Sequence, residues 1–334
     1  MTAFAPLPQP RTTDGSLRRV GVEMEMADIS LDAIAGIIID GFGGEQQRLS
    51  PFEQTITGTR FGDFQLELDS SLLKRREYLD YLESMGVTVD REAEPGTLER
   101  ALAEVAGLIV PHEVVAPPIP HDALPELDQL RARLRAAGAR GTHASLVYAF
   151  GLQLNLELAR QDVDSILRHL QAFLLLHDWL LEEAQTDLSR RLTPFVEPFP
   201  PSWEQRILQP DYAPDLERLI DDYLTDNPTR NRPLDMLPLF AHLSPGQIEA
   251  APVEHHLIRP RPTFHYRLPD CRIDEPDWDL SVPWNGWVAV ERLAEDPPRL
   301  AAMAHAYLNR PEETLLDKGR RWAAQVSDWL RSGT

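Results

Sequence analysis

Polar and acidic side chains alternate with apolar ones in four short segments of this chain. These segments are 20–26 (VGVEMEM), 64–69 (FQLELD), 152–158 (LQLNLEL) and 263–268 (TFHYRL). Side chains alternate between the two faces of a β-strand, so each segment predicts a strand with one polar and one apolar face. Carboxylates crowded on one face repel each other unless cations neutralise them, and Mg²⁺ prefers such oxygen ligands. We therefore expect a metal-dependent site on the polar face of a sheet that contains these strands.

The residue types favour a site over an ordinary strand surface. Any antiparallel sheet with one face in water shows polar alternation, but Asp and Asn are depleted from strands in general. Here the polar positions are occupied by Glu23, Glu25, Glu67, Asp69, Asn155 and Glu157. A wetted face remains the alternative for any one strand, whereas the four strands together favour a site.

Arginines near the last segment could complement these acids. Arg259, Arg261 and Arg267 lie in or just before it, and a guanidinium can bind phosphate or carboxylate through two parallel hydrogen bonds. Ordinary salt bridges to the chain's many acids would explain them equally well. Carboxylates and arginines on one face suit phosphoryl transfer. The chain has no G-x-x-x-x-G-K-[ST] loop, so metals and arginines would have to hold any nucleotide.

Glu113 stands in an otherwise apolar segment, 110–118 (VPHEVVAPP). A carboxylate there is either half-buried against a partner or on the same polar face. Cys271 is the only cysteine, which excludes an intrachain disulfide and a thiolate zinc cluster and makes the cytoplasm the expected compartment.

Around these segments the chain predicts strands separated by helices in an α+β fold. Amphipathic patterns predict helices over 30–39, 97–108, 122–137 and 162–184, with a helical tail from Trp287 onward. Residues 1–18 are expected to be a flexible leader, and 19–334 a single domain. Prolines mark about 187–250 as a mostly irregular insertion or lid.

Composition excludes some partners. The chain has 334 residues, 43% of them hydrophobic, which is enough for a sizeable core. The net charge of -20 argues against a non-specific hold on nucleic acid, and the apolar run around 173–176 is too short to span a membrane. The expected partners are therefore small molecules or peptides.

Three segments resemble motifs of the carboxylate-amine ligase superfamily, which includes glutamine synthetase and glutamate-cysteine ligase. Residues 20–26 resemble its G-[VI]-E-x-E opening strand. Residues 64–71 and 111–118 are similar to the D-x-S strand and the E-[VI]-[VI]-S-P-P signature of its amidoligase branch. The matches run in order over most of residues 19–270. The resemblance implies a glutamine synthetase-like fold, an antiparallel sheet with helices packed behind it and a concave polar face that holds ATP and Mg²⁺.

The resemblance also implies roles for single residues. Glu23, Glu25 and Glu113 would be metal ligands. Arg267 matches the phosphate-binding Arg of an E-x-R strand, with Arg259 as a helper.

Two departures from the motifs concern the same face. His265 replaces the Glu of E-x-R, and Gln153 and Asn155 replace the imidazoles of G-x-H-[VI]-H. Because an imidazole or an amide oxygen can still coordinate a metal, we expect His265 to be a metal ligand. Gln153, Asn155, Arg259 and Arg261 are expected to contact the cofactor.

The expected function is amide-bond formation between a carboxylate and an amine, dependent on ATP and Mg²⁺ and proceeding through an acyl phosphate. Glu67 or Asp69 could position or deprotonate the amine. Two alternatives stay open. One is a binding or structural protein that keeps the fold without activity, and the other is a metal-dependent phosphohydrolase that uses the same carboxylates.

Overall fold

The computed structural model of the chain describes residues 3–50, 52–68, 111–142, 150–184, 196–310 and 315–331, with the side chains of the last range described from 319 onward. Asp69 and the helix expected over 97–108 lie outside these ranges.

One antiparallel sheet runs through the described part of the chain. Its order is β2-β3-β4-β5-β1-β7-β9-β8, and β6 pairs with β1 beside this path. The strands are β1 Arg19–Met26, β2 Glu45–Ser50, β3 Glu53–Thr59, β4 Gly62–Leu68, β5 His112–Val115, β6 Ile119–Pro120, β7 Leu152–Glu157, β8 Leu234–Asp235 and β9 Thr263–Tyr266. The four strands predicted from alternation are β1, β4, β7 and β9. All four lie in this sheet, which confirms the α+β class.

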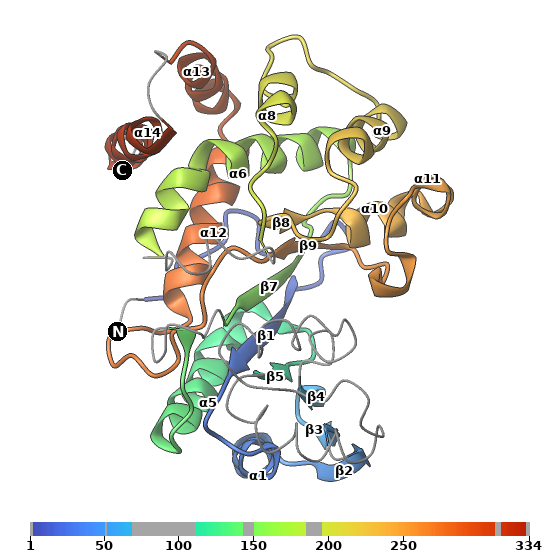
Figure 1. Ribbon diagram of the computed structural model, residues 1–334, viewed down its shortest axis with the longest axis vertical. Coiled ribbons are helices and arrows are strands. Elements are labelled where there is room, and N and C mark those ends of the chain that lie inside the picture. Colours follow the sequence, from blue (N-terminus) through green and yellow to red (C-terminus); the bar gives the residue numbers. More distant parts are fainter. Residues whose placement is uncertain are drawn as a thin grey trace, which may run out of the picture.

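The apolar face of the sheet packs against the hydrophobic core. Val22, Met24 and Leu66 are completely buried, and they occupy the positions that alternate with the polar residues of β1 and β4. Helices cover this face (Figure 1): α1 Leu31–Phe42 and α5 Leu124–Ala136 lie beside the β1–β5 region, and α6 Val163–Glu183 and α12 Ser281–Ala294 lie nearer β9.

Aromatic contacts fix these helices to the sheet. Phe173 of α6 and Trp287 of α12 meet Tyr266 of β9, with ring centroids 5.9 and 5.6 Å away respectively. At the other end, Phe42 of α1 stacks on Phe64 of β4 with centroids 5.7 Å apart. Such pairs stabilise beyond the area they bury. With its back held in this way, the sheet presents its polar positions on the opposite face.

The Pro-rich segment differs from the expectation. Its described part, 196–250, is mostly helical rather than irregular, and it contributes β8 to the sheet. The helices are α8 Pro201–Ile207, α9 Leu216–Asp226, α10 Leu237–Leu243 and α11 Pro245–Ala250. Three of them carry proline at the first or second helical position, where the missing N–H has no helical partner to lose. A lid role for this segment stays a prediction.

The expected flexible leader contacts α12 through Ala5. The backbone N–H of Ala5 donates to the side-chain oxygen of Asn285 over 2.8 Å, and the Trp284 indole donates to the Ala5 carbonyl over 2.8 Å. The leader is therefore held against α12. The remaining helices are α13 Pro297–Leu308 and α14 Leu315–Arg331. Within the described ranges, no helix has both the length and the hydropathy to cross a bilayer.

Candidate active site

A row of glutamates crosses four neighbouring strands on the polar face. Glu25 of β1 stands opposite Glu113 of β5. Glu113 in turn stands opposite Glu67 of β4, and Glu67 opposite Glu53 of β3. Directly opposed residues of antiparallel strands share a face, with Cβ atoms about 4.5–5.5 Å apart. The register thus brings Glu25, Glu67 and Glu113 together as the sequence predicted. It also adds Glu53, which we call with them the glutamate row.

Like charges directly opposite one another destabilise a sheet. Glu25, Glu67 and Glu113 are half-buried and Glu53 is exposed. One oxygen of Glu25 accepts the backbone N–H of Gly151 over 2.6 Å, which compensates part of its charge. Carboxylate oxygens are the donors that Mg²⁺ prefers, so the row offers the ligand type that such a cation needs.

A second group of polar residues continues the same face across β1, β7, β9 and β8. Glu23 stands opposite Gln153, and Asn155 stands opposite His265. His265 in turn stands opposite Asp235 of β8. Every described residue of the predicted site that lies within a strand is therefore on one face.

The comparison with family models decides the affiliation of this arrangement. The model described as "Putative amidoligase enzyme" matches residues 16–289, a span that holds every site residue named above. The chain belongs to this amidoligase family. A search of curated proteins found no match to it.

In this amidoligase-family protein, a series of hydrogen bonds links four polar residues of β1, β7 and β9. The Asn155 amide donates to Glu23 Oε1 over 2.7 Å, and the Gln153 amide donates to Asn155 Oδ1 over 2.6 Å. Gln153 Nε2 also lies 3.1 Å from His265 Nδ1. We call Glu23, Asn155, Gln153 and His265 the amide chain.

The carboxylate at its end sets the direction of the amide chain. An ionised carboxylate only accepts hydrogen bonds, so Asn155 must turn its NH₂ toward Glu23 and its oxygen toward Gln153. Gln153 must then present its NH₂ to both Asn155 and His265. His265 Nδ1 therefore accepts, and the ring proton lies on Nε2, which is 3.1 Å from the Thr263 hydroxyl.

His265 is a neutral imidazole in this environment. Burial, followed by the charges of Arg230, Arg261 and Arg267, holds the pKa of His265 well below its usual range. Both ring nitrogens already have hydrogen-bonding partners. The ring could coordinate a metal only by giving one of them up, so its role as a metal ligand stays a prediction.

The arginines gather at the β8–β9 end of the face. Arg261 Nη1 lies 4.0 Å from Glu23 Oε1. Arg230 Nε donates to the buried Asp235 over 2.9 Å, and Arg267 donates to the backbone carbonyl of Arg230. Arg259 is exposed in the loop that precedes β9. The polar face is therefore acidic over β3, β4, β5 and β1, and rich in guanidinium groups near β9 and β8.

The donor types fit a hard divalent cation, but the side chains are not gathered around one point. Within the part of the chain that the structure describes, no group of three or more His, Cys, Asp or Glu side chains is arranged to hold a metal ion. The glutamate row thus supplies the oxygen donors without converging on one position. Asp69, the predicted partner of Glu67, lies outside the described residues.

Sequence reasoning missed three residues of this face. Glu53 lies in a segment whose alternation, EQTITGT, could have identified it. Asp235 belongs to a strand of only two residues, too short for any periodic signal. Arg230 lies in a loop that reaches the face only because β8 pairs with β9.

Proposed function

We propose that this protein is a ligase that joins a carboxylate to an amine with ATP and Mg²⁺. The observation that carries the proposal is the division of one sheet face into an acidic half and a guanidinium-rich half, in a chain of the amidoligase family. A carboxylate must be activated before an amine can attack it, and phosphorylation requires charge neutralisation from both a cation and arginines.

Each half of the face has its own task in the proposal. Glu25 and Glu113, helped by Glu23, would hold Mg²⁺, which neutralises charge on the phosphates when bound. Arg261 and Arg267 would bind the transferred phosphoryl group or the substrate carboxylate, because a guanidinium matches either anion. Arg259 could reach the outer part of the nucleotide from its exposed loop.

The chemistry has two steps. An oxygen of the substrate carboxylate attacks the γ-phosphorus of ATP, the bond from that phosphorus to the bridging oxygen breaks, and ADP leaves. The amine nitrogen then attacks the acyl carbon, phosphate leaves with the bonding electrons, and the nitrogen gives its proton to a carboxylate. Glu67 or Asp69 is the proposed acceptor of that proton.

The amide chain has a positioning role in this proposal. Asn155 fixes Glu23 from one side while Arg261 approaches it from the other. Gln153 holds Asn155 in turn, and His265 holds Gln153. We assign Asn155, Gln153 and His265 to keeping Glu23 in place rather than to contact with the reacting atoms.

The test incubates purified protein with ATP, Mg²⁺ and panels of amines and carboxylates, and follows ADP and new amides by mass spectrometry. Glu25→Gln and Glu113→Gln should lower amide formation at least about 100-fold. The control Glu126→Gln changes a partly exposed residue of α5 that pairs with Arg60, and it should retain full activity.

The same assay separates the alternatives. ADP together with a new amide supports the ligase. Release of phosphate without an acceptor supports a phosphohydrolase. A protein that binds no ATP analogue and makes no product in any condition would overturn the proposal in favour of a non-catalytic binding protein.

A further inference from the structure

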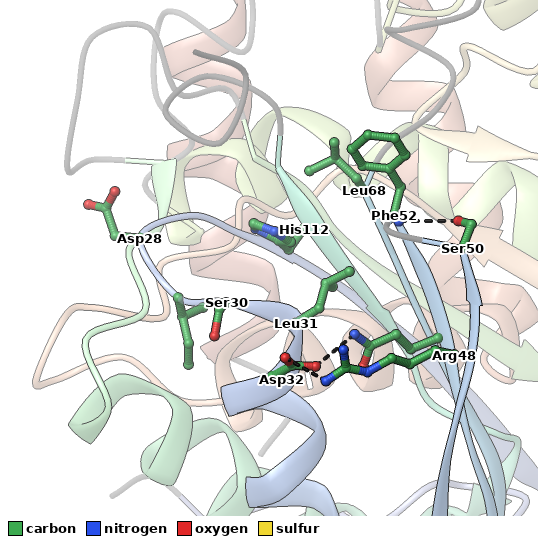
Figure 2. A pocket seen from close by; sticks show the side chains of 11 residues that line it. Asp28, Ser30, Leu31, Asp32, Arg48, Ser50, Phe52, Leu68 and His112 are labelled. Atoms are coloured by element: carbon green, nitrogen blue, oxygen red, sulfur yellow. Dashed lines mark hydrogen bonds and ion pairs between the residues drawn. The ribbon is translucent and has the colours of Figure 1, made fainter. Parts of the chain in front are cut away.

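A pocket lies between the start of α1 and the strands β2 to β5, with a volume of about 600 Å³. The loop after β1 supplies Asp28 and Ser30 on one side, and Ser50 and Phe52 lie on the other (Figure 2). The remaining lining residues are Ile29, Leu31, Asp32, Arg48, Gln54, Leu68 and His112. The pocket is large enough for a small organic molecule.

This pocket is separate from the glutamate row. Leu68 and His112 directly follow and precede Glu67 and Glu113 in the sequence. Since neighbouring side chains of a strand point to opposite faces, both lining residues belong to the apolar face. The pocket therefore lies behind the sheet, on the opposite side from the proposed reaction centre.

On one wall of the pocket, the charges of Asp32 and Arg48 neutralise each other. The Asp32 carboxylate accepts hydrogen bonds from Arg48 over 2.8 Å, from Gln54 over 3.0 Å and from Gln46 over 2.9 Å. The hydrogen bond from Gln54, followed by that from Gln46 and the charge of Arg48, holds the pKa of Asp32 below its usual range. Asp32 and Arg48 thus form a wall whose charges cancel.

Asp28 brings a charge that this wall does not cancel. Among the described residues, no hydrogen bond or ion pair involves its carboxylate, and it is exposed. Its φ of 61° is the single positive φ among the described non-glycine residues, a conformation that Asp and Asn tolerate better than other side chains but that still costs energy. Residues held in such conformations cluster at binding sites.

His112 contributes an unused hydrogen-bonding atom. Its Nδ1 is buried and has no hydrogen-bonding partner in the described part of the chain. Leaving a buried polar group unsatisfied costs about 1–3 kcal/mol, which a ligand could recover. Apolar surface beside it comes from Leu31, Leu68 and Phe52.

We propose that this pocket binds a small organic amine, a single ammonium group on an apolar body. The ammonium would pair with the Asp28 carboxylate and donate a second hydrogen bond to His112 Nδ1. The apolar body of the ligand would lie against Phe52 and Leu68. Among the described lining residues, two carboxylates against one guanidinium give a net negative charge, within a chain whose net charge is -20. That field favours a cation over an anion of the same size.

Calorimetric titration with phenethylamine tests the proposal, with phenylacetate and phenethyl alcohol as the matched anion and neutral ligand. Phenethylamine should bind the wild-type protein at least about tenfold more tightly than the alcohol, and phenylacetate should not bind. Asp28→Asn keeps the tolerated backbone conformation and Asp28→Gly relieves it, yet both should weaken phenethylamine binding about tenfold or more.

His112→Phe separates the ligand site from a purely structural role. The variant removes the unsatisfied nitrogen, so its urea midpoint without ligand should be no lower than that of the wild type, while phenethylamine binds more weakly. A variant that loses stability but keeps its affinity would contradict the assignment of His112.

Glu25→Gln distinguishes this site from the reaction centre. It should leave phenethylamine binding unchanged while it weakens binding of Mg²⁺ and an ATP analogue. The inference is overturned if the wild type binds no phenethylamine, if Asp28→Asn binds it equally well, or if Glu25→Gln abolishes its binding. None of these results bears on ligase activity, which the mass-spectrometric assay measures separately.

Discussion

The side-chain amide of Asn155 donates to Glu23 Oε1 over 2.7 Å, across the seam between β7 and β1. This contact joins the acidic half of the polar face to the half that carries His265 and the arginines. It is also the step that sets the direction of the amide chain, because Glu23 can only accept.

Asn155→Asp would replace this donor with a carboxylate beside Glu23. Asn155 is 4% exposed, so we expect the variant to lose about 1–3 kcal/mol of unfolding free energy at pH 7. The folded-state pKa of the new carboxyl would be raised, so the loss should shrink as the pH falls toward 4 and the group becomes protonated in both states. Urea denaturation at several pH values measures this.

Asn309→Asp is the control for that variant, because Asn309 is exposed at the end of α13. Its amide donates to the His305 carbonyl over 2.7 Å at the helix end, so the change should cost no more than about 1 kcal/mol of unfolding free energy. Equal effects of the two substitutions would contradict the buried contact.

Gly21→Ala would crowd the amide chain from the backbone of β1. A Cβ at Gly21 would lie 3.3 Å from Asn155 Cβ and 3.4 Å from Asn155 Nδ2. We expect Asn155 to shift by a few tenths of an ångström. The rate of amide formation should fall clearly, while the melting temperature should change little. Gly36→Ala is the matched control in α1, because no atom lies within 4 Å of a Cβ built there. It should raise the unfolding free energy by about 0.5–1 kcal/mol because alanine favours the helix. Parallel melting curves and activity assays compare the two.

Breaking the buried ion pair between Arg18 and Glu291 should be strongly destabilising. The two side chains are 3% and 2% exposed, and they share two hydrogen bonds of 2.8 and 2.6 Å. Glu291→Leu leaves a buried guanidinium unpaired, so we expect a loss of about 3–5 kcal/mol. The double variant with Arg18→Met should regain most of it. A double-mutant cycle from chemical denaturation gives both numbers, and additive effects would disprove the coupling.

His169 predicts a loss of stability in mild acid. Burial lowers the pKa of His169, while the unfolded chain keeps a value of about 6.5. Below that pH the His169 imidazole is protonated in the unfolded state but stays neutral in the folded state. This residue should therefore reduce the unfolding free energy by up to about 1.4 kcal/mol per pH unit.

His169→Asn should flatten the dependence of unfolding free energy on pH between 6.5 and 5. The same change at the exposed His256 should leave the slope as it is in the wild type. If the slope is unchanged in both variants, a group other than His169 causes the loss of unfolding free energy in acid.

Local patterns in the sequence predicted which residues share a face, but not which strands are neighbours. Alternation placed Glu23 and Glu25 together because both belong to β1. The row formed by Glu25, Glu113 and Glu67 depends on β5 lying between β1 and β4, which pairing between distant segments decides. Proline gave a misleading signal over 196–250 because it begins a helix as readily as it breaks one. Asp235 acquires its place only when β8 docks on β9.

The seam between β1 and β7 has a consequence for when the proposed activity would appear during folding. Glu23 and Asn155 are 132 residues apart in the chain, and contacts of such long range are slow to form. A partly folded molecule can hold either half of the polar face without the other. Recovery of catalysis during refolding should therefore lag behind the return of helical signal, and fragments cut between the two strands should be inert until they are mixed.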